Sequence, residues 1–275
     1  TADKKLYALR DVTGTVESIP LIASSIMSKK LASGTDVICL DVTVGEGAFM
    51  KNIENARELA KTMVGIGKSL NRSTVAVISD MSEPLGYAVG NALEVKEAID
   101  ALHGRGPEDL MELCYTCGAI MLTEAKLFSS KEDARKALYD SIKKGTAFEK
   151  FKAMVKEQGG DVSYLENPSK FGLAKNIIPI VSEEDGYVEK INALTIGESS
   201  MRLGGGRETL DDVIDMSAGI ILSKKVGDIV SKGEVLCTLH TNKEDFDDVI
   251  IDVKKAFKIS SSPVSKVQVI KEIIE

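Results

Sequence analysis

Two short apolar segments with a helical segment between them place the strongest constraint on the fold. Residues 36–42 and 74–80 are rich in strand-forming side chains, and such continuous apolar runs are typical of strands buried on both faces. Between them, residues 51–70 carry apolar side chains at helical spacing. Two strands joined through a helix lie parallel in one sheet. The sequence therefore predicts an α/β fold with a partly parallel sheet and flanking helices.

The remainder of the chain divides into a helical part and a later part with a shorter period. Residues 18–32 and most of 89–158 have helical spacing, with breaks at 104–107 and 129–130. The later part is expected to hold strands at 177–181, 186–191 and 219–222, a helical insert near 208–215, a hairpin at 226–236, a helix at 243–259 and a β-like tail at 264–270. This pattern predicts a smaller C-terminal α+β domain with barrel-like strands, separated from the first at some point between residues 159 and 175.

The charge balance and the lack of long apolar runs narrow the classes of function. The 275 residues include 35 basic and 42 acidic ones, and the net charge of -7 has the wrong sign for binding nucleic-acid phosphates or anionic lipid. No apolar run approaches the roughly 20 residues of a membrane span, and the first residues lack the apolar block of a signal peptide. Four cysteines in a chain of this length do not indicate a disulfide framework. We therefore expect a cytoplasmic protein with a small-molecule ligand, and neither a nucleic acid nor a membrane as partner.

A hydroxyl and an ammonium group share one face of the helix expected at 18–32. Ser25 and Lys29 are four residues apart, so their side chains point the same way, and Arg10 lies in the irregular segment just upstream. These three donors suit a ligand edge made of acceptors, such as a carboxylate or the O2–N3–O4 edge of a pyrimidine. The alternative is that Lys29 belongs to a solvated face and that Arg10 pairs with Asp11 or Glu17.

Other motifs favour structural roles. Cys114 and Cys117 form a C-x-x-C in the middle of an expected helix, and without a second Cys/His pair they are expected to be buried small apolar residues and not a zinc or redox site. The glycine-rich turn at 204–207 does not follow the phosphate-loop pattern and is expected to serve packing. His103 and His240 are too scattered for a metal site.

The order of motifs closely resembles the thymidine and pyrimidine-nucleoside phosphorylase family. The motifs are LYALRDVTGTV at 6–16, SIPLIASSIMSKK at 18–30, LDV at 40–42, GEGAFM at 45–50, MSEPLG at 81–86, GNALEV at 90–95, GRGP at 104–107 and LGGGR at 203–207. The resemblance covers essentially the whole chain. It implies that residues 1–33 belong to a helical, base-binding domain, residues 34–165 to an α/β domain and residues 166–275 to the C-terminal domain.

The resemblance also implies the ligands of the site. In that family the residues matching Arg10, Ser25 and Lys29 bind the pyrimidine base. The positions matching Leu85 and Ala88 bind a potassium ion through their backbone carbonyls, and the position matching Glu97 binds it through its carboxylate. Neutral carbonyls with one carboxylate suit a large monovalent cation. Without the resemblance, the expectation for Glu97 is a solvent-facing residue near a helix N-terminus.

The resemblance also shows departures from the family. Family members carry a further helical segment and a phosphate-binding loop ahead of this region, so the chain is expected to be a fragment that lacks phosphorolysis on its own. Thr43 stands where the family usually has lysine, and Glu46 where a small residue is common. Both changes make the local charge more negative near a loop that is expected to face phosphate.

The implied reaction is phosphorolysis of uridine, thymidine or both, giving the free base and an α-pentose 1-phosphate, with Arg10 and Lys29 stabilising the charge on the leaving base. The intact enzyme is expected to be a homodimeric pentosyltransferase with inorganic phosphate as co-substrate. One alternative is an anthranilate-type phosphoribosyltransferase, which would need a magnesium and pyrophosphate site. The other is a non-catalytic interaction or carrier module, which would be favoured if the natural chain begins at residue 1. The lipoyl-like rhythm at 226–236 gives it little support, because the expected tight turn has no exposed lysine between two apolar neighbours.

Overall fold

The computed structural model describes residue 5, residue 9 and residues 12–16, 18–209 and 211–275. The main helices are α2 (Ile19–Ala32), α3 (Ile53–Ser69), α4 (Asn91–Leu102), α5 (Glu108–Glu124), α6 (Lys131–Lys143), α7 (Thr146–Glu157), α9 (Ala193–Ser200) and α10 (Asp247–Ala256), with shorter helical turns α8 (Ser163–Glu166), η1 (Pro168–Phe171) and η2 (Met201–Gly205). The strands are β1 (Val37–Val44), β2 (Ser73–Asp80), β3 (Ala88–Val89), β4 (Asn176–Val181), β5 (Gly186–Ile191), β6 (Gly219–Leu222), β7 (Ile229–Val230), β8 (Val235–Thr241), β9 (Phe257–Ser260) and β10 (Ile270–Ile274). Within the described part of the chain, no helix combines the length and the apolar character needed to cross a membrane.

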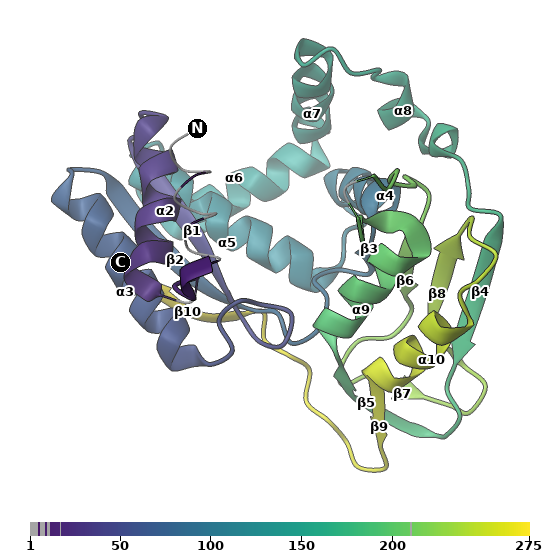
Figure 1. Ribbon diagram of the computed structural model, residues 1–275. Coiled ribbons are helices and arrows are strands. Elements are labelled where there is room, and N and C mark those ends of the chain that lie inside the picture. Colours follow the sequence, from purple (N-terminus) through teal and green to yellow (C-terminus); the bar gives the residue numbers. More distant parts are fainter. Residues whose placement is uncertain (1–4, 6–8, 10–11, 17, 210) are drawn as a thin grey trace.

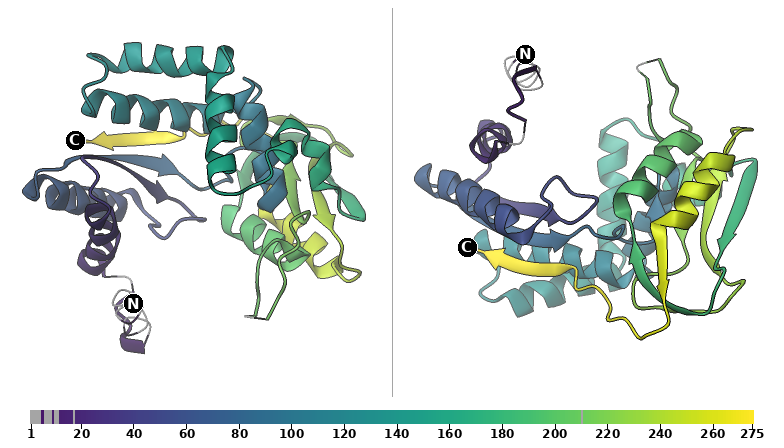
Figure 2. Two further views of the ribbon diagram at one scale, coloured as in Figure 1. Left: turned by 90° about the horizontal axis from the view of Figure 1, so that it is seen from above. Right: turned by 60° about the horizontal axis from the view of Figure 1, so that its bottom comes forward.

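The strand–helix–strand prediction is confirmed. β1 and β2 run parallel in register from Val37 opposite Ser73 to Val44 opposite Asp80, and α3 forms the connection between them. Figure 2 shows α3 and α2 on one face of this sheet, with α5 and then α6 on the other. Alternate β1 residues, including Ile38, Leu40 and Val42, are buried in the core beneath α3, and Ala23 and Met27 of α2 join the same core. The sheet is thus covered on both faces, as its apolar strands require.

The last strand returns to the first sheet. The β-like tail expected at 264–270 is instead β10 at Ile270–Ile274, which pairs antiparallel with β2 and completes the order β1-β2-β10. The Arg57 guanidinium of α3 meets the Glu272 carboxylate at 2.8 Å. A tail of alternating apolar residues fits any open sheet edge, so its pattern does not indicate which sheet it joins.

The second half is built on two small antiparallel sheets that share one core. Their orders are β3-β6-β8-β4 and β7-β5-β9, and among the described strands they do not close into a barrel. The prediction of a hairpin at 226–236 is therefore wrong, because β7 pairs with β5 whereas β8 pairs with β6 and β4. Val230 and Leu236 are both buried in the core between the sheets, so the turn between them, with Gly233 at φ +85°, carries the chain from one sheet to the other.

Two helix predictions in this half also need correction. The described residues of 208–215 form turns and irregular backbone, because the Asp212 carboxylate accepts hydrogen bonds from the backbone amides of Glu208 and Thr209. The helix lies earlier, at α9, where the Asn192 side chain caps it by accepting from the Thr195 amide at 3.0 Å. The helix expected at 243–259 is shorter, since α10 ends at Ala256 and the chain continues as β9.

Candidate active site

The predicted base-binding residues divide between described and undescribed parts of the chain. On α2, Ala23 and Met27 are buried against the core beneath α3, while Ser25 is half-buried and Lys29 is exposed. Ser25 and Lys29 are one helical turn apart and share a face, as predicted. Arg10 lies outside the described residues, as do Asp11 and Glu17, so its place beside that face stays a prediction.

The loops that follow β1 and β2 meet at the carboxyl ends of these strands, which is where open parallel sheets bind ligands. The Gly47 amide donates to the Met81 carbonyl at 3.0 Å, and the Met81 amide donates to Val44 at 2.7 Å. Gly45 has φ +137°, and a Cβ there would lie 2.6 Å from the Ser82 nitrogen. The two loops therefore pack as one unit that requires a glycine at position 45.

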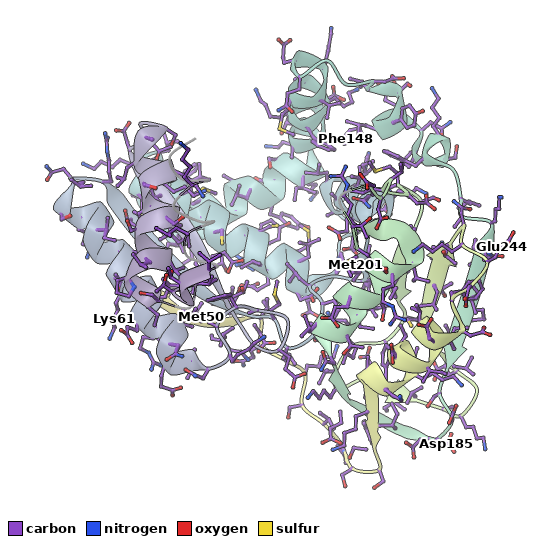
Figure 3. The ribbon with its side chains drawn as sticks, in the orientation of Figure 1. Met50, Lys61, Phe148, Asp185, Met201 and Glu244 are labelled. Atoms are coloured by element: carbon purple, nitrogen blue, oxygen red, sulfur yellow. The ribbon has the colours of Figure 1, made fainter. Side chains whose placement is uncertain are left out.

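Glu46 links this loop to the second half of the molecule. Its carboxylate pairs with the Lys190 ammonium of β5 and accepts from the Asn192 side chain at 2.7 Å. The loop ends at Met50, labelled in Figure 3, which is buried in the core beneath α3. The negative charge at Glu46 is thus balanced by a lysine from another sheet, which the sequence could not reveal. Thr43, half-buried on β1, has no such explanation.

Lys225 is the best-connected cation among the described residues near these loops. Its ammonium lies 2.9 Å from an oxygen of Asp109 and 3.7 Å from one of Glu83, and it donates to the carbonyls of Pro84 and, at 3.1 Å, Gly86. The Lys225 and Glu83 side chains are 12% and 10% exposed. Burial raises the pKa of Glu83, although the Lys225 charge opposes that rise. Lys225 therefore holds the segment 83–86 against the start of α5.

Lys225 also lines a pocket of about 380 Å³ between these elements. The lining residues include Tyr87, Glu108, Asp228 and Lys266, so both signs of charge face the space. Sequence reasoning missed Lys225, because its partners lie more than a hundred positions away and nothing in its own neighbourhood points to them. The Lys-Lys pair just before Val226 and Gly227 is typical of an ordinary polar turn.

The three predicted potassium ligands lie together at one turn. The Glu97 carboxylate of α4 accepts from the backbone amides of Tyr87 at 2.8 Å and Ala88 at 3.1 Å. Gly86 has φ +67°, and a Cβ there would overlap a Glu97 carboxylate oxygen. Burial raises the pKa of Glu97, more than the two amide hydrogen bonds lower it. Glu97 is therefore a half-buried residue aimed at this turn and not a solvent-facing one.

Some backbone carbonyl groups of this turn accept hydrogen bonds from neighbouring elements. Lys225 takes those of Pro84 and Gly86, and the Leu222 amide donates to that of Tyr87 at 2.8 Å. The carbonyls of Leu85 and Ala88 are not among the acceptors in these contacts. A set of two carbonyls and one carboxylate fits a large monovalent cation. Within the described ranges, no cluster of three His, Cys, Asp or Glu side chains is arranged to hold a metal ion.

The two groups of predicted site residues lie apart. In Figures 1 and 2, α2, which carries Ser25 and Lys29, covers one face of the first sheet, whereas α4, which carries Glu97, lies beyond the ends of the strands beside the second half of the molecule. The structure brings Leu85, Ala88 and Glu97 together and keeps Ser25 with Lys29. It does not bring one group to the other.

The glycine-rich turn and the C-x-x-C motif pack against neighbouring elements, but one expectation about the cysteines is wrong. The Gly205 carbonyl accepts from the Asn91 side chain at 2.8 Å, and Gly204 has φ +113°, so the turn at 204–207 packs against the start of α4, in line with the expected packing role. Cys114 is exposed on α5, so the expectation that both cysteines of the C-x-x-C are buried is wrong for it. Cys117 is half-buried and faces β1.

Comparison with known proteins identifies the family of the chain. Residues 1–148 match the model of the glycosyl transferase family a/b domain, and residues 187–260 match the pyrimidine nucleoside phosphorylase C-terminal domain. The chain is 55% identical over 263 residues to a pyrimidine-nucleoside phosphorylase of Geobacillus stearothermophilus, covering 96% of this chain and 61% of that protein. It is 57% identical over 260 residues to the enzyme of that name from Bacillus subtilis, covering 94% of this chain and 60% of that protein.

The match extends along the chain without a large gap. A third relative of the same name, from Staphylococcus haemolyticus, is 53% identical over 274 residues and covers 100% of this chain and 63% of its own length. The chain thus spans about three fifths of the length of these relatives, as the shares of 60–63% show. The chain and these relatives are thus 53–57% identical over 94–100% of the chain. The chain belongs to the glycosyl transferase family that includes the pyrimidine-nucleoside phosphorylases.

Proposed function

We propose that this chain serves in the reversible phosphorolysis of pyrimidine nucleosides. In this reaction inorganic phosphate attacks the anomeric carbon, the glycosidic bond breaks, and the products are the free base and an α-pentose 1-phosphate. The observation that carries the proposal is the identity of 53–57% with relatives named pyrimidine-nucleoside phosphorylase, over 94–100% of the chain. The substrates proposed are uridine, thymidine or both, together with phosphate.

The face of α2 that carries Ser25 and Lys29 is proposed to hold the base, with Arg10 beside it. A pyrimidine leaves as an anion whose charge spreads over O2, N3 and O4. Cationic donors placed where this charge develops stabilise the transition state more than the ground state. Lys29 and Arg10 would supply the charge, and the Ser25 hydroxyl would fix the orientation of the base.

Potassium is proposed as the cofactor, held by the carbonyls of Leu85 and Ala88 and by the Glu97 carboxylate. When bound, such a cation would supply positive charge that offsets the burial of Glu97 and fixes the turn before α4. The supporting geometry is the half-buried Glu97 carboxylate, which the Tyr87 and Ala88 amides hold against this turn. Further ligands would come from the part of the relatives that this chain does not match.

The groups that hold phosphate are proposed to lie in that unmatched part as well. Positioning two substrates contributes roughly 7–11 kcal/mol in reactions of this kind, so one half-site alone should give no measurable turnover. Closure of the two parts over the substrates would exclude water and bring the phosphate in line with the glycosidic bond. The 275-residue chain by itself is therefore expected to be inactive.

The test compares the chain with a joined protein in which the N-terminal part of the Geobacillus relative precedes it. Uracil release from uridine is followed by chromatography with phosphate present or omitted. We expect phosphate-dependent release by the joined protein and none by the chain alone. Transfer that requires phosphoribosyl pyrophosphate instead would favour a phosphoribosyltransferase, and release by neither protein would favour a non-catalytic module. Sedimentation of the joined protein checks the predicted homodimer.

A further inference from the structure

Two cysteines that are distant in sequence meet between β1 and α5. Cys39 lies in the middle of β1, on the face opposite Ile38 and Leu40, and this face looks toward α5. Cys117 lies on the face of α5 that packs against the sheet. The two side chains pack against the same apolar cluster, which includes Val77, and the two thiols interact, since each shifts the pKa of the other. The fold therefore creates a thiol pair that the C-x-x-C motif did not predict.

The contact shifts the pKa values of the two thiols in opposite directions. The interaction with Cys117 lowers the pKa of Cys39, although burial and the nearby Asp41 carboxylate oppose the shift. The same contact and burial raise the pKa of Cys117. The thiolate is the nucleophilic form of cysteine. This difference favours Cys39 as the sulfur that attacks an oxidant, with Cys117 beside it to resolve the product.

Cys39 and Cys117 are each only partly buried, so the pair is not sealed off from a small oxidant. β1 is an edge strand of its sheet among the described residues, so one flank of Cys39 has no neighbouring strand in that sheet. The other two cysteines differ in setting. Cys114 is exposed on α5 and Cys237 is fully enclosed in β8, which makes them internal controls for exposure and for burial.

We propose that Cys39 and Cys117 are a peroxide-sensitive dithiol, which hydrogen peroxide converts into a disulfide that joins β1 to α5. In the first step the Cys39 sulfur attacks one peroxide oxygen, the O–O bond breaks, and the products are a sulfenic acid and water. In the second step the Cys117 sulfur attacks the Cys39 sulfur, the S–O bond breaks, and a second water leaves. Two thiols are oxidised and one peroxide is reduced, so the reaction balances.

The experiment treats the folded 275-residue chain with hydrogen peroxide and blocks the remaining thiols with a maleimide. Peptides are then mapped by mass spectrometry without reduction. We expect a cross-linked peptide pair containing Cys39 and Cys117, lost after dithiothreitol, with Cys114 and Cys237 still carrying the maleimide or open to it after unfolding. In C117S, the sulfenic acid on Cys39 should persist and be trapped by dimedone, while C114S should form the cross-link at the wild-type rate.

The wild-type map decides the matter even if a variant folds poorly. A cross-link between Cys114 and Cys117, or oxidation that reaches Cys114 while Cys39 and Cys117 remain thiols, would overturn the proposal. So would equal cross-linking of all four cysteines in the folded chain, which is the pattern expected for protein that peroxide has unfolded. Formation of the same Cys39–Cys117 link in urea at an equal rate would show that the fold contributes nothing.

Discussion

Replacing Lys225 with methionine should be among the most damaging single changes of a charged residue in this chain. Methionine keeps most of the aliphatic stem, so the packing of the segment 83–86 is largely preserved and the change removes mainly the ammonium. That loss leaves the carbonyls of Pro84 and Gly86 without their donor and leaves Glu83 and Asp109 without their cation. The Glu83 and Asp109 side chains are 10% and 23% exposed, so water replaces the lost charge poorly.

The expected cost follows from this burial. Removing one partner of a buried ion pair typically destabilises a protein by about 3–5 kcal/mol. The Glu83 carboxylate keeps one backbone donor, the Val226 amide at 2.9 Å, so we expect the lower end, about 3 kcal/mol. A matched control is Lys258→Met, whose partner Glu189 lies 2.9 Å away with both side chains well exposed. Exposed pairs contribute about 0–1 kcal/mol, so this control should lose little.

The pH dependence gives a second readout with a definite sign. Burial already raises the pKa of Glu83 in the folded chain, and removing Lys225 takes away the charge that opposes this rise. A carboxyl group with a raised folded pKa favours folding when protonated, and that contribution is lost as pH rises through the folded pKa. The deficit of Lys225→Met should therefore be largest near neutral pH and shrink as pH falls toward 4.5, the ordinary pKa of a glutamic acid.

Urea denaturation followed by circular dichroism measures both effects, with the free energy of unfolding obtained by linear extrapolation at each pH. The reasoning fails if Lys225→Met lies within about 1 kcal/mol of Lys258→Met at neutral pH, the limit expected for exposed pairs. It also fails if the deficit grows as the pH is lowered.

The remaining predictions concern α3 and the turn before α4. Gly65→Ala should stabilise the chain by about 0.5–1 kcal/mol, because a Cβ there meets nothing within 4 Å in a helix interior, as urea denaturation checks. Gly67→Ala, two residues on, should instead cost about 1–3 kcal/mol in the same assay, because its Cβ would overlap the Thr74 hydroxyl oxygen. Replacing sodium with potassium should raise the melting temperature of the joined protein. Glu97→Gln should abolish that shift, whereas Glu94→Gln, at an exposed position on the same helix, should keep it; equal shifts in both variants would argue against the proposed cation site.

The first half of the fold could be predicted because its signals are local. Residues 36–42 and 74–80 are continuous apolar runs, and the helix between them has its apolar face at regular spacing, so period and connection length together specify a parallel crossover. Similarly, Ser25 and Lys29 share a face by helical geometry alone. These inferences need no knowledge of what lies on the other side of the sheet.

The second half depended on contacts between distant residues. Nothing near Ile229 or Val235 indicates that the chain changes sheets between them, since both segments are short and apolar. The Glu46 and Lys225 charges each have partners far along the sequence, so composition shows only an acidic or basic residue. The Cys39–Cys117 pair was missed for the same reason, because the spacing of the C-x-x-C motif drew attention to a partner within its own helix.

The measurement that tests the central claim most directly compares two adjacent lysines of α2 in the joined protein. Lys29→Ala should lower kcat/KM for phosphate-dependent uracil release by roughly two to three decades, about 3–4 kcal/mol, because it removes a donor to the charge that develops on the leaving base. Lys30→Ala removes the same charge from a different face of the helix and should leave kcat/KM within about twofold, a surface effect of about ±0.5 kcal/mol. Equal rates for the two variants, or no phosphate-dependent release by the joined protein, would contradict the account.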